Sequence, residues 1–167
     1  MKSKFILSGL VLVSVFTIGA SLASAQNDLS GKWVLDKSRS SDISPMTGIS
    51  MTITQKGAKV DIIQKLAMSG GEETHNDTFV LDGKTQDAML VGPNNIKAKG
   101  KRTSKKVDGG FESVDEGTFS GSGLPQALTV KTTRKWRLSS DGKTLTLDLT
   151  RASDIGTRES HRVFTRA

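Results

Sequence analysis

The sequence contains no cysteine and no tyrosine, and it has only two histidines and three prolines. Without cysteine the chain cannot form a disulfide, so burial of apolar side chains must hold the fold together. A lipid anchor at a cleaved N-terminus is excluded for the same reason. The histidines, His75 and His161, have no second ligand at a metal-binding spacing, so we expect no metal site, and no cofactor is indicated.

Recognisable catalytic and nucleotide-binding motifs are also missing. No G-x-S-x-G elbow is present, and no glycine-rich phosphate loop occurs. Residues 26–167 contain only six aromatic side chains, so nucleic acid would find few stacking platforms. These absences argue against nucleic-acid binding and against the common hydrolase classes.

The first 25 residues have the organisation of a secretory signal peptide. Two lysines precede an apolar stretch, and the small residues Ala23-Ser24-Ala25 precede Gln26. Serine and glycine interrupt the stretch and no basic cluster follows it, which disfavours a membrane anchor. We therefore expect cleavage after Ala25 and a periplasmic or secreted protein with no transmembrane span in the mature chain.

The remaining residues, 26–167, suit a single domain with one core. The whole chain has a formal charge of +7, and loss of two lysines with the signal peptide lowers it to +5. This moderate excess favours contact with anionic surfaces without requiring it.

Apolar residues recur with a period of two through most of this domain, which predicts β-strands. In ISMTITQ, Ile49, Met51 and Ile53 share one face, and Val60 and Ile62 continue the pattern after a turn. Asp-Gly pairs at 82–83, 108–109 and 141–142 predict tight hairpin turns, because glycine tolerates a positive φ. No stretch of ten residues has a helical period.

The C-terminal third has the most regular alternation. Two strands are predicted on either side of residues 141–142, and their shared faces consist of Leu128, Val130, Thr132, Arg134, Trp136 and Leu138, then Leu145, Leu147 and Leu149. The segment TRESHRVFT forms the last predicted strand. About eight to ten short-looped strands favour an all-β, antiparallel up-and-down barrel, which leaves few exposed sheet edges. The alternative is a two-sheet β-sandwich.

The first predicted strand carries Gly31-x-Trp33, which resembles the lipocalin and wider calycin pattern. The longer GKWVLDKSRSS is similar to the opening of small bacterial secreted proteins described as lipocalin-like. This resemblance implies a lipocalin-like barrel in which Trp33 packs at the closed end and a C-terminal arginine covers it. Arg162 is the residue that would match, so Gly31, Trp33 and Arg162 are interpreted as structural.

Several residues are candidates for contact with a ligand inside such a barrel. Arg134 is in phase with the apolar face of its strand, where it would bind either a ligand anion or a core carboxylate. Trp136 shares that face, and Met51, Met68 and Met89 would add adaptable lining or simply fill the core. Glu159 and His161 are two apart on the last strand and form a candidate acid and base.

Lysines form the densest charge of the domain. Those at 97, 99 and 101 share one strand face, Lys105 and Lys106 follow, and a second outward set comprises Lys131, Lys135 and Arg137. These side chains are interpreted as a solvated exterior that protects a sheet edge or meets an anionic envelope surface.

Three functions remain open at this point. The first is a non-catalytic, secreted or periplasmic binding protein for a small apolar or amphipathic ligand. The second is an envelope interaction module with a filled barrel and a basic exterior. The third is an enzyme on a lipocalin-like scaffold that uses Glu159 and His161.

Overall fold

The computed structural model describes residues 28–92, 96–121, 124 and 126–167, so the predicted signal peptide lies outside the described residues. The described chain is almost entirely β-strand, with one short 3-10 turn, η2 (Lys37–Arg39). No helix in this part of the chain has the length and apolarity that a membrane crossing requires. The strands are β1 (Gly31–Leu35), β2 (Met46–Lys56), β3 (Lys59–Met68), β4 (Gly71–Val80), β5 (Asp82–Val91), β6 (Lys97–Val107), β7 (Gly110–Phe119), β8 (Leu128–Leu138), β9 (Thr144–Ser153) and β10 (Gly156–Arg166).

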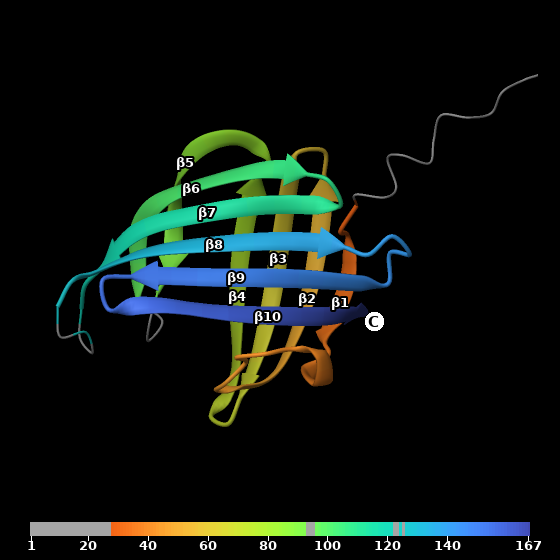
Figure 1. The fold of residues 1–167 in the computed structure, drawn as a ribbon, viewed down its shortest axis with the longest axis horizontal. Helices are drawn as coiled ribbons and strands as arrows, with labels where there is room; N and C mark the ends of the chain where they lie inside the picture. The colour runs from red at the N-terminus through yellow and green to blue at the C-terminus, as the bar shows by residue number, and fades with distance from the viewer. Residues whose placement is uncertain (1–27, 93–95, 122–123, 125) are drawn as a thin grey trace, which may run out of the picture.

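The ten strands form one antiparallel sheet that curls into a nearly closed up-and-down barrel. Their order is β4-β3-β2-β1-β10-β9-β8-β7-β6-β5, so β1 pairs with β10, and β4 and β5 stand at the two edges. Figure 1 shows β2 to β4 running steeply across the direction of β7 to β10. The predicted all-β barrel is confirmed, with ten strands, and the two-sheet sandwich is not observed.

Two of the three predicted hairpin turns are confirmed. Residues 108–109 join β6 to β7, and residues 141–142 join β8 to β9, with glycine at positive φ in both turns. The hairpin predicted at 82–83 is wrong. Gly83 does have a positive φ, but it lies within β5, and β5 pairs with β6 and not with β4. A local turn signal does not determine whether the strands on either side of it pair.

The predicted inward faces are correct, and they fill one end of the barrel. Ile49, Met51 and Ile53 on β2 and Val60 and Ile62 on β3 are all at most 3% exposed. Apolar residues of β8 and β9 join the same core, including Trp136, Leu145 and Leu147. Period-two alternation places these side chains on one face because successive residues of a strand point to opposite sides.

Three aromatic rings span the interior at this filled end. The ring centroids of Phe79 and Phe111 are 5.1 Å apart, and those of Phe111 and Trp136 are 5.8 Å apart. Phe79 belongs to β4, whereas the other two rings belong to β7 and β8. The stack therefore connects distant parts of the sheet through the core and forms the floor of the space above it.

Trp33 of the G-x-W segment is a core residue, and the arginine that covers its ring is not the one expected from the resemblance. Trp33 is fully buried, and its Nε1 donates a hydrogen bond to the Leu29 carbonyl at 3.0 Å. The guanidinium that covers the ring is that of Arg166, 4.5 Å from the centroid, and not that of Arg162. A Cβ on Gly31 would lie 2.5 Å from Arg166 Nη1, so glycine leaves room for this arginine.

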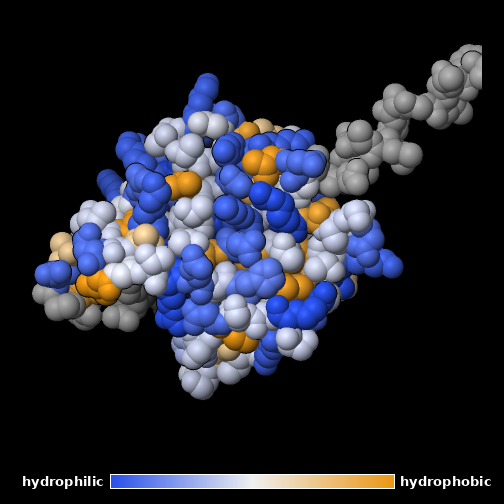
Figure 2. Space-filling model, in the orientation of Figure 1, coloured by the Kyte–Doolittle hydropathy of each residue, from blue (hydrophilic) through white to orange (hydrophobic). Residues whose placement is uncertain are grey.

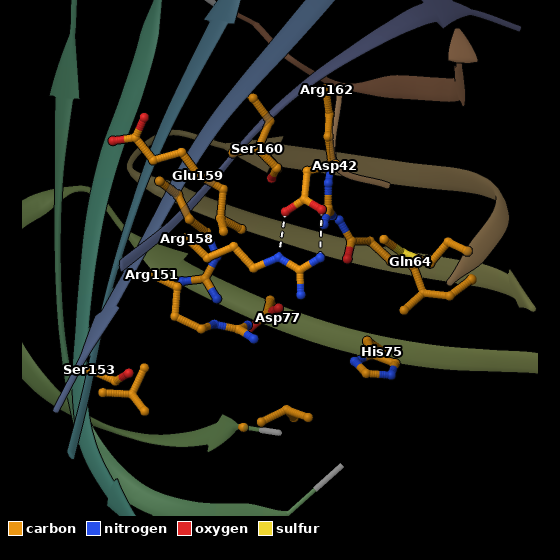
Figure 3. Close-up of a pocket in the computed structure, with 18 of the residues that line it drawn as sticks. Asp42, Gln64, His75, Asp77, Arg151, Ser153, Arg158, Glu159, Ser160 and Arg162 are labelled. Carbon is orange, nitrogen blue, oxygen red and sulfur yellow. Dashed lines mark hydrogen bonds and ion pairs between the residues drawn. The ribbon is translucent and has the colours of Figure 1, made fainter. Parts of the chain in front are cut away.

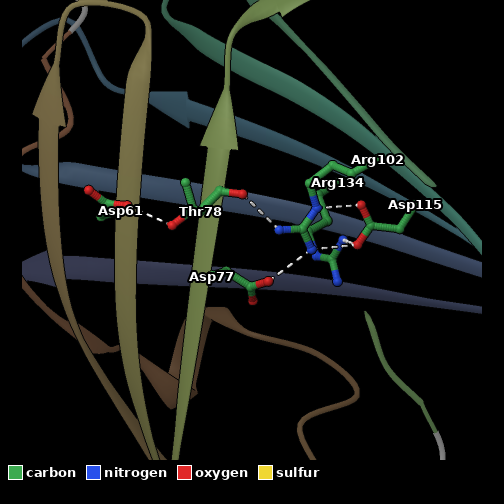
Figure 4. Close-up of polar contacts among 6 residues, drawn as sticks. All are labelled: Asp61, Asp77, Thr78, Arg102, Asp115 and Arg134. Atoms are coloured by element: carbon green, nitrogen blue, oxygen red, sulfur yellow. Dashed lines mark hydrogen bonds and ion pairs between the residues drawn. The ribbon is translucent and has the colours of Figure 1, made fainter. Parts of the chain in front are cut away.

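Buried charge closes the seam between the two sheet edges. Arg102 of β6 donates from Nε and Nη2 to Asp115 on β7, from Nη2 to Asp77 on β4, and from Nη1 to the carbonyl of Thr78 at 3.0 Å (Figure 4). Its guanidinium also lies 4.3 Å from the Phe79 ring centroid. Arg102 thus reaches past the edge strand β5 and connects β6 and β7 to the free edge of β4 across the seam.

Asp115 is the counter-charge at the centre of this network. Its Oδ2 also accepts a hydrogen bond from Arg134 Nη1 at 2.6 Å. Burial alone would raise the pKa of Asp115, but hydrogen bonds and charges from Arg102 and Arg134 lower it overall. Burial would likewise lower the pKa of Arg102, and the two carboxylates raise it. Asp115 and Arg102 therefore stay charged although both are buried, because each satisfies the other.

Replacement of this central carboxylate should destabilise the barrel strongly. We expect Asp115→Asn to lower the free energy of unfolding by about 3–5 kcal/mol, because Arg134 loses its carboxylate partner and the buried Arg102 keeps only Asp77. Urea unfolding followed by circular dichroism measures the change. The matched control is Asp87→Asn, an exposed partner of Lys101 on the outer surface, which should leave the free energy of unfolding nearly unchanged. Similar losses for both variants would contradict the assigned role.

The same carboxylate predicts a pH dependence. Its folded-state pKa is lower than the unfolded value of about 3.9. The stability it contributes is therefore complete above that unfolded value and is lost as the pH falls through the folded-state pKa. The stability difference between the wild type and Asp115→Asn should consequently shrink in acid. A difference that stayed constant from neutral pH to about pH 2 would rule out this linkage.

Candidate functional site

A cavity of about 840 Å³ occupies the barrel above the aromatic floor. It lies toward the barrel end that carries the β1–β2 connection and the β9–β10 turn, and it has the size of sites that hold small organic ligands. Much of its wall is apolar and comes from distant strands. This apolar lining comprises Met46, Ile62, Leu66, Met68, Phe79, Leu128, Val130, Trp136, Leu147 and Leu149.

The wall formed by β4 is polar. Glu73, His75 and Asp77 alternate along its inner face and line the cavity. His75 Nε2 lies 3.2 Å from Glu73 Oε2, and Asp77 is held by Arg102. Among the described residues, no three histidine, aspartate or glutamate side chains are grouped as a metal ion would require.

The opposite wall carries four arginines, which we call the arginine cluster: Arg134 of β8, Arg151 of β9, and Arg158 and Arg162 of β10. The strand register places them around Leu149. Leu149 lies between Arg134 and Ser160, Arg151 lies directly opposite Arg158, and Leu147 lies directly opposite Arg162. Figure 3 shows Arg151, Arg158 and Arg162 directed toward the same region of the cavity.

Two members of the cluster have carboxylate partners. Arg134 binds Asp115, as described above. Arg158 forms a two-pronged ion pair with Asp42 in the β1–β2 connection, with Nε to Oδ2 at 2.6 Å and Nη2 to Oδ1 at 2.5 Å (Figure 3). This hydrogen bonding raises the pKa of Arg158 and lowers that of Asp42. The pair lies at the cavity mouth, where the arginine side chain is 68% exposed.

The other two, Arg151 and Arg162, make no hydrogen bond or ion pair with any described residue, although both are largely removed from solvent. Burial lowers the pKa of Arg151, and repulsion from Arg134 and Arg158 lowers it further. Burial also lowers the pKa of Arg162, as do Arg151 and Arg134, with a partial offset from Asp42. Like charges placed opposite one another on a sheet are destabilising.

Hydrogen-bond donors without partners lie beside these two charges. Ser160 Oγ and Arg162 Nε are buried, line the cavity, and have no hydrogen-bond partner among the described residues. The same is true of Trp136 Nε1 at the floor. Buried polar groups normally have partners, so this group of donors marks a place for a molecule that supplies acceptors.

The structure brings half of the predicted ligand-contacting residues to the cavity. Arg134, Trp136 and Glu159 line it. Met51 is buried in the core, where its sulfur accepts from Gln64 Nε2 at 3.1 Å, and Met89 is 57% exposed on the outer surface. Met68, also considered from the sequence, does line the cavity. Whether any of these residues contacts a ligand stays a prediction.

The predicted acid and base do not form a pair inside the barrel. His161 points to the outer surface, where its Nδ1 lies 2.6 Å from Asp148 Oδ1 on β9. Glu159 is two residues from His161 on β10 and lies at the rim of the cavity. In Figure 3 its carboxylate points away from the arginine cluster. Arg158, Ser160 and Arg162 alternate along β10 and line the cavity as well.

The basic exterior is partly neutralised by neighbouring carboxylates. Lys131 pairs with Glu116 at 2.9 Å, and Lys101 pairs with Asp87 at 2.7 Å. Arg137 pairs with Glu112 at 2.9 Å. Figure 2 shows hydrophilic side chains over most of the face formed by β6 to β10, interrupted by small apolar spots. Contact with an anionic envelope surface stays a prediction.

Sequence reasoning identified only one member of the arginine cluster as a ligand contact. The sequence did indicate that Arg151 points inward, because it continues the period-two alternation of Leu145, Leu147 and Leu149. Similarly, Arg158 and Arg162 are in phase with the fully buried Phe164. The neighbouring Val163 is buried too and is in phase with residues 159 and 161, so the sequence of β10 leaves two possible inward phases.

No protein-family model and no curated protein matches this chain. One similar solved structure is the crystal structure of the zebrafish ileal bile acid-binding protein in complex with cholic acid. The two chains are 18% identical, and the similarity covers 83% of this chain and 98% of that chain, with a TM-score of 0.49. The resemblance concerns the path of the chain, and we assign no site residue from it.

Two arginines of the last strand should respond in opposite ways to the same substitution. We expect Arg162→Gln to raise the free energy of unfolding by about 1 kcal/mol, because it removes an unpaired, largely buried charge. Arg166→Gln should lower it by about 1 kcal/mol, because the Trp33 ring loses its cation and two carbonyls lose a donor. Chemical unfolding of both variants measures this, and destabilisation by Arg162→Gln would contradict the assignment.

Proposed function

We propose that this protein is a non-catalytic binding protein that holds one amphipathic anion in its barrel. The observation that carries this proposal is the pair of inward arginines without acidic partners beside a largely apolar cavity of about 840 Å³. The apolar part of the ligand occupies the space between β3 and β9, and its anionic group binds Arg151 and Arg162. An anion there offsets the repulsion within the arginine cluster.

The cavity favours this function over the two alternatives. A filled barrel would leave no such space above the aromatic floor. An enzyme using Glu159 and His161 would need both groups at the cavity, and His161 is paired on the outer surface. We propose a periplasmic or secreted location on the basis of the signal-peptide pattern in residues 1–25.

Native mass spectrometry of the purified protein, followed by organic extraction, tests this function. We expect a chain that begins at Gln26 and carries one amphipathic anion per protein. The double variant Arg151→Gln/Arg162→Gln should be purified without it, because hydrogen bonds to charged groups contribute about 1.5–3 kcal/mol each. Lys135→Gln, an exposed change on the outer face of β8, is the matched control and should keep the ligand.

The outcome that would overturn the proposal has two parts. The wild-type protein would show the mass of the free chain, and it would take up neither dodecanoate nor an apolar fluorescent probe. If the double variant kept the same ligand, the protein would still be a binding protein, but the anionic group of the ligand would not be bound by Arg151 and Arg162.

A further inference from the structure

The strand register makes the arginine cluster a fixed pattern and not a chance grouping of long side chains. Three inward positions on each of β8, β9 and β10 form a grid. Its rows are Thr132–Arg151–Arg158, then Arg134–Leu149–Ser160, then Trp136–Leu147–Arg162. Arg134 lies directly opposite Leu149, Arg151 is two residues along the same strand, and Arg158 and Arg162 are its diagonal neighbours, so the four long side chains can meet above Leu149.

The charges on this grid do not cancel locally. Asp115 offsets Arg134, and Asp42 offsets Arg158 through two hydrogen bonds. Asp77 and Asp115 together hold Arg102 outside the grid. Arg151 and Arg162 remain without a hydrogen-bonded carboxylate among the described residues, so two positive charges that repel each other are left in the cavity wall.

The groups available to a ligand there are donors. Two guanidiniums present forked N–H groups, and the unpartnered Ser160 hydroxyl lies between Arg158 and Arg162 along β10. A carboxylate brings one charge and two oxygens, which leaves one guanidinium uncompensated. A phosphomonoester brings nearly two charges and three acceptor oxygens at neutral pH. It therefore matches both the charge and the number of donors.

We propose that the ligand of this cavity is an amphiphile whose anionic group is a dianionic phosphomonoester, held by Arg151, Arg162 and Ser160. This inference rests on the proposed function and specifies its ligand class. The apolar chain extends from the arginine cluster along the hydrophobic wall formed by residues such as Ile62, Leu66 and Leu128.

Isothermal titration with three compounds of equal chain length tests this inference: dodecyl phosphate, dodecyl sulfate and dodecanoate, each below its micelle concentration. Sulfate has the same three terminal oxygens as phosphate but one charge. We expect dodecyl phosphate to bind about tenfold more tightly than the other two at about pH 7.5. The advantage should disappear near pH 5, because the second phosphate pKa is about 6, while dodecyl sulfate affinity should stay constant.

Variants assign the preference to particular side chains. Arg151→Gln and Arg162→Gln should each reduce the ratio of affinities for dodecyl phosphate and dodecyl sulfate at about pH 7.5 to about twofold or less. Each variant keeps only one unpaired guanidinium, which a singly charged headgroup already neutralises. Lys135→Gln should keep the full advantage, because its side chain lies on the outer face of the same sheet. Unfolding curves recorded in parallel establish that each variant is folded.

The outcomes separate this inference from the function on which it rests. Equal affinity for dodecyl phosphate and dodecyl sulfate at both pH values would contradict the proposed preference for a dianionic headgroup. It would still agree with the proposed function as a binding protein. Absence of binding by all three alkyl compounds would overturn both. If inorganic phosphate bound as tightly as dodecyl phosphate, the site would take a free anion, and the amphiphile would be rejected.

Discussion

The barrel is closed between β4 and β6 by the ion pairs of one buried arginine, Arg102, because a buried charge is costly unless it has partners of opposite charge. Arg102 is the side chain that crosses from β6 to the free edge of β4, and a guanidinium can remain there only if carboxylates accompany it. Asp115 and Asp77 meet that requirement, and Phe79 lies against the guanidinium plane. Because β4 and β5 are the sheet edges, this network takes the place of the missing ladder of backbone hydrogen bonds.

The interior of the barrel has two parts, a filled core and a cavity, and the aromatic floor lies between them. Below, the rings of Phe79, Phe111 and Trp136 belong to the buried hydrophobic core. Above it, the same inward faces carry arginines, and the space stays open. One strand thus serves both ends: Trp136 of β8 belongs to the floor, and Arg134, two residues earlier, belongs to both the buried network and the arginine cluster.

Most of the fold could be predicted from the sequence, because period-two alternation reports directly which face of a strand is buried. Ile49, Met51 and Ile53 illustrate this. The open seam at residues 82–83 could not be predicted, since strand pairing depends on partners far along the chain. The candidate site was predicted least well. Residues 159 and 161 were chosen for their acid and base chemistry, and the two possible inward phases of β10 did not show that Arg158, Ser160 and Arg162 line the cavity.

The exchange of roles between two arginines explains why the site was missed. A C-terminal arginine was expected to cover Trp33, and assignment of that role to Arg162 made it structural. Arg166 performs that role, because β10 pairs Arg166 directly with Trp33. Arg162 is then left in the cavity without a hydrogen-bonded acidic partner, in a protein that pairs Arg102, Arg134 and Arg158. Most inward arginines of this protein have a carboxylate partner, and the two that have none among the described residues, Arg151 and Arg162, line one cavity. Such exceptions are expected at a functional site.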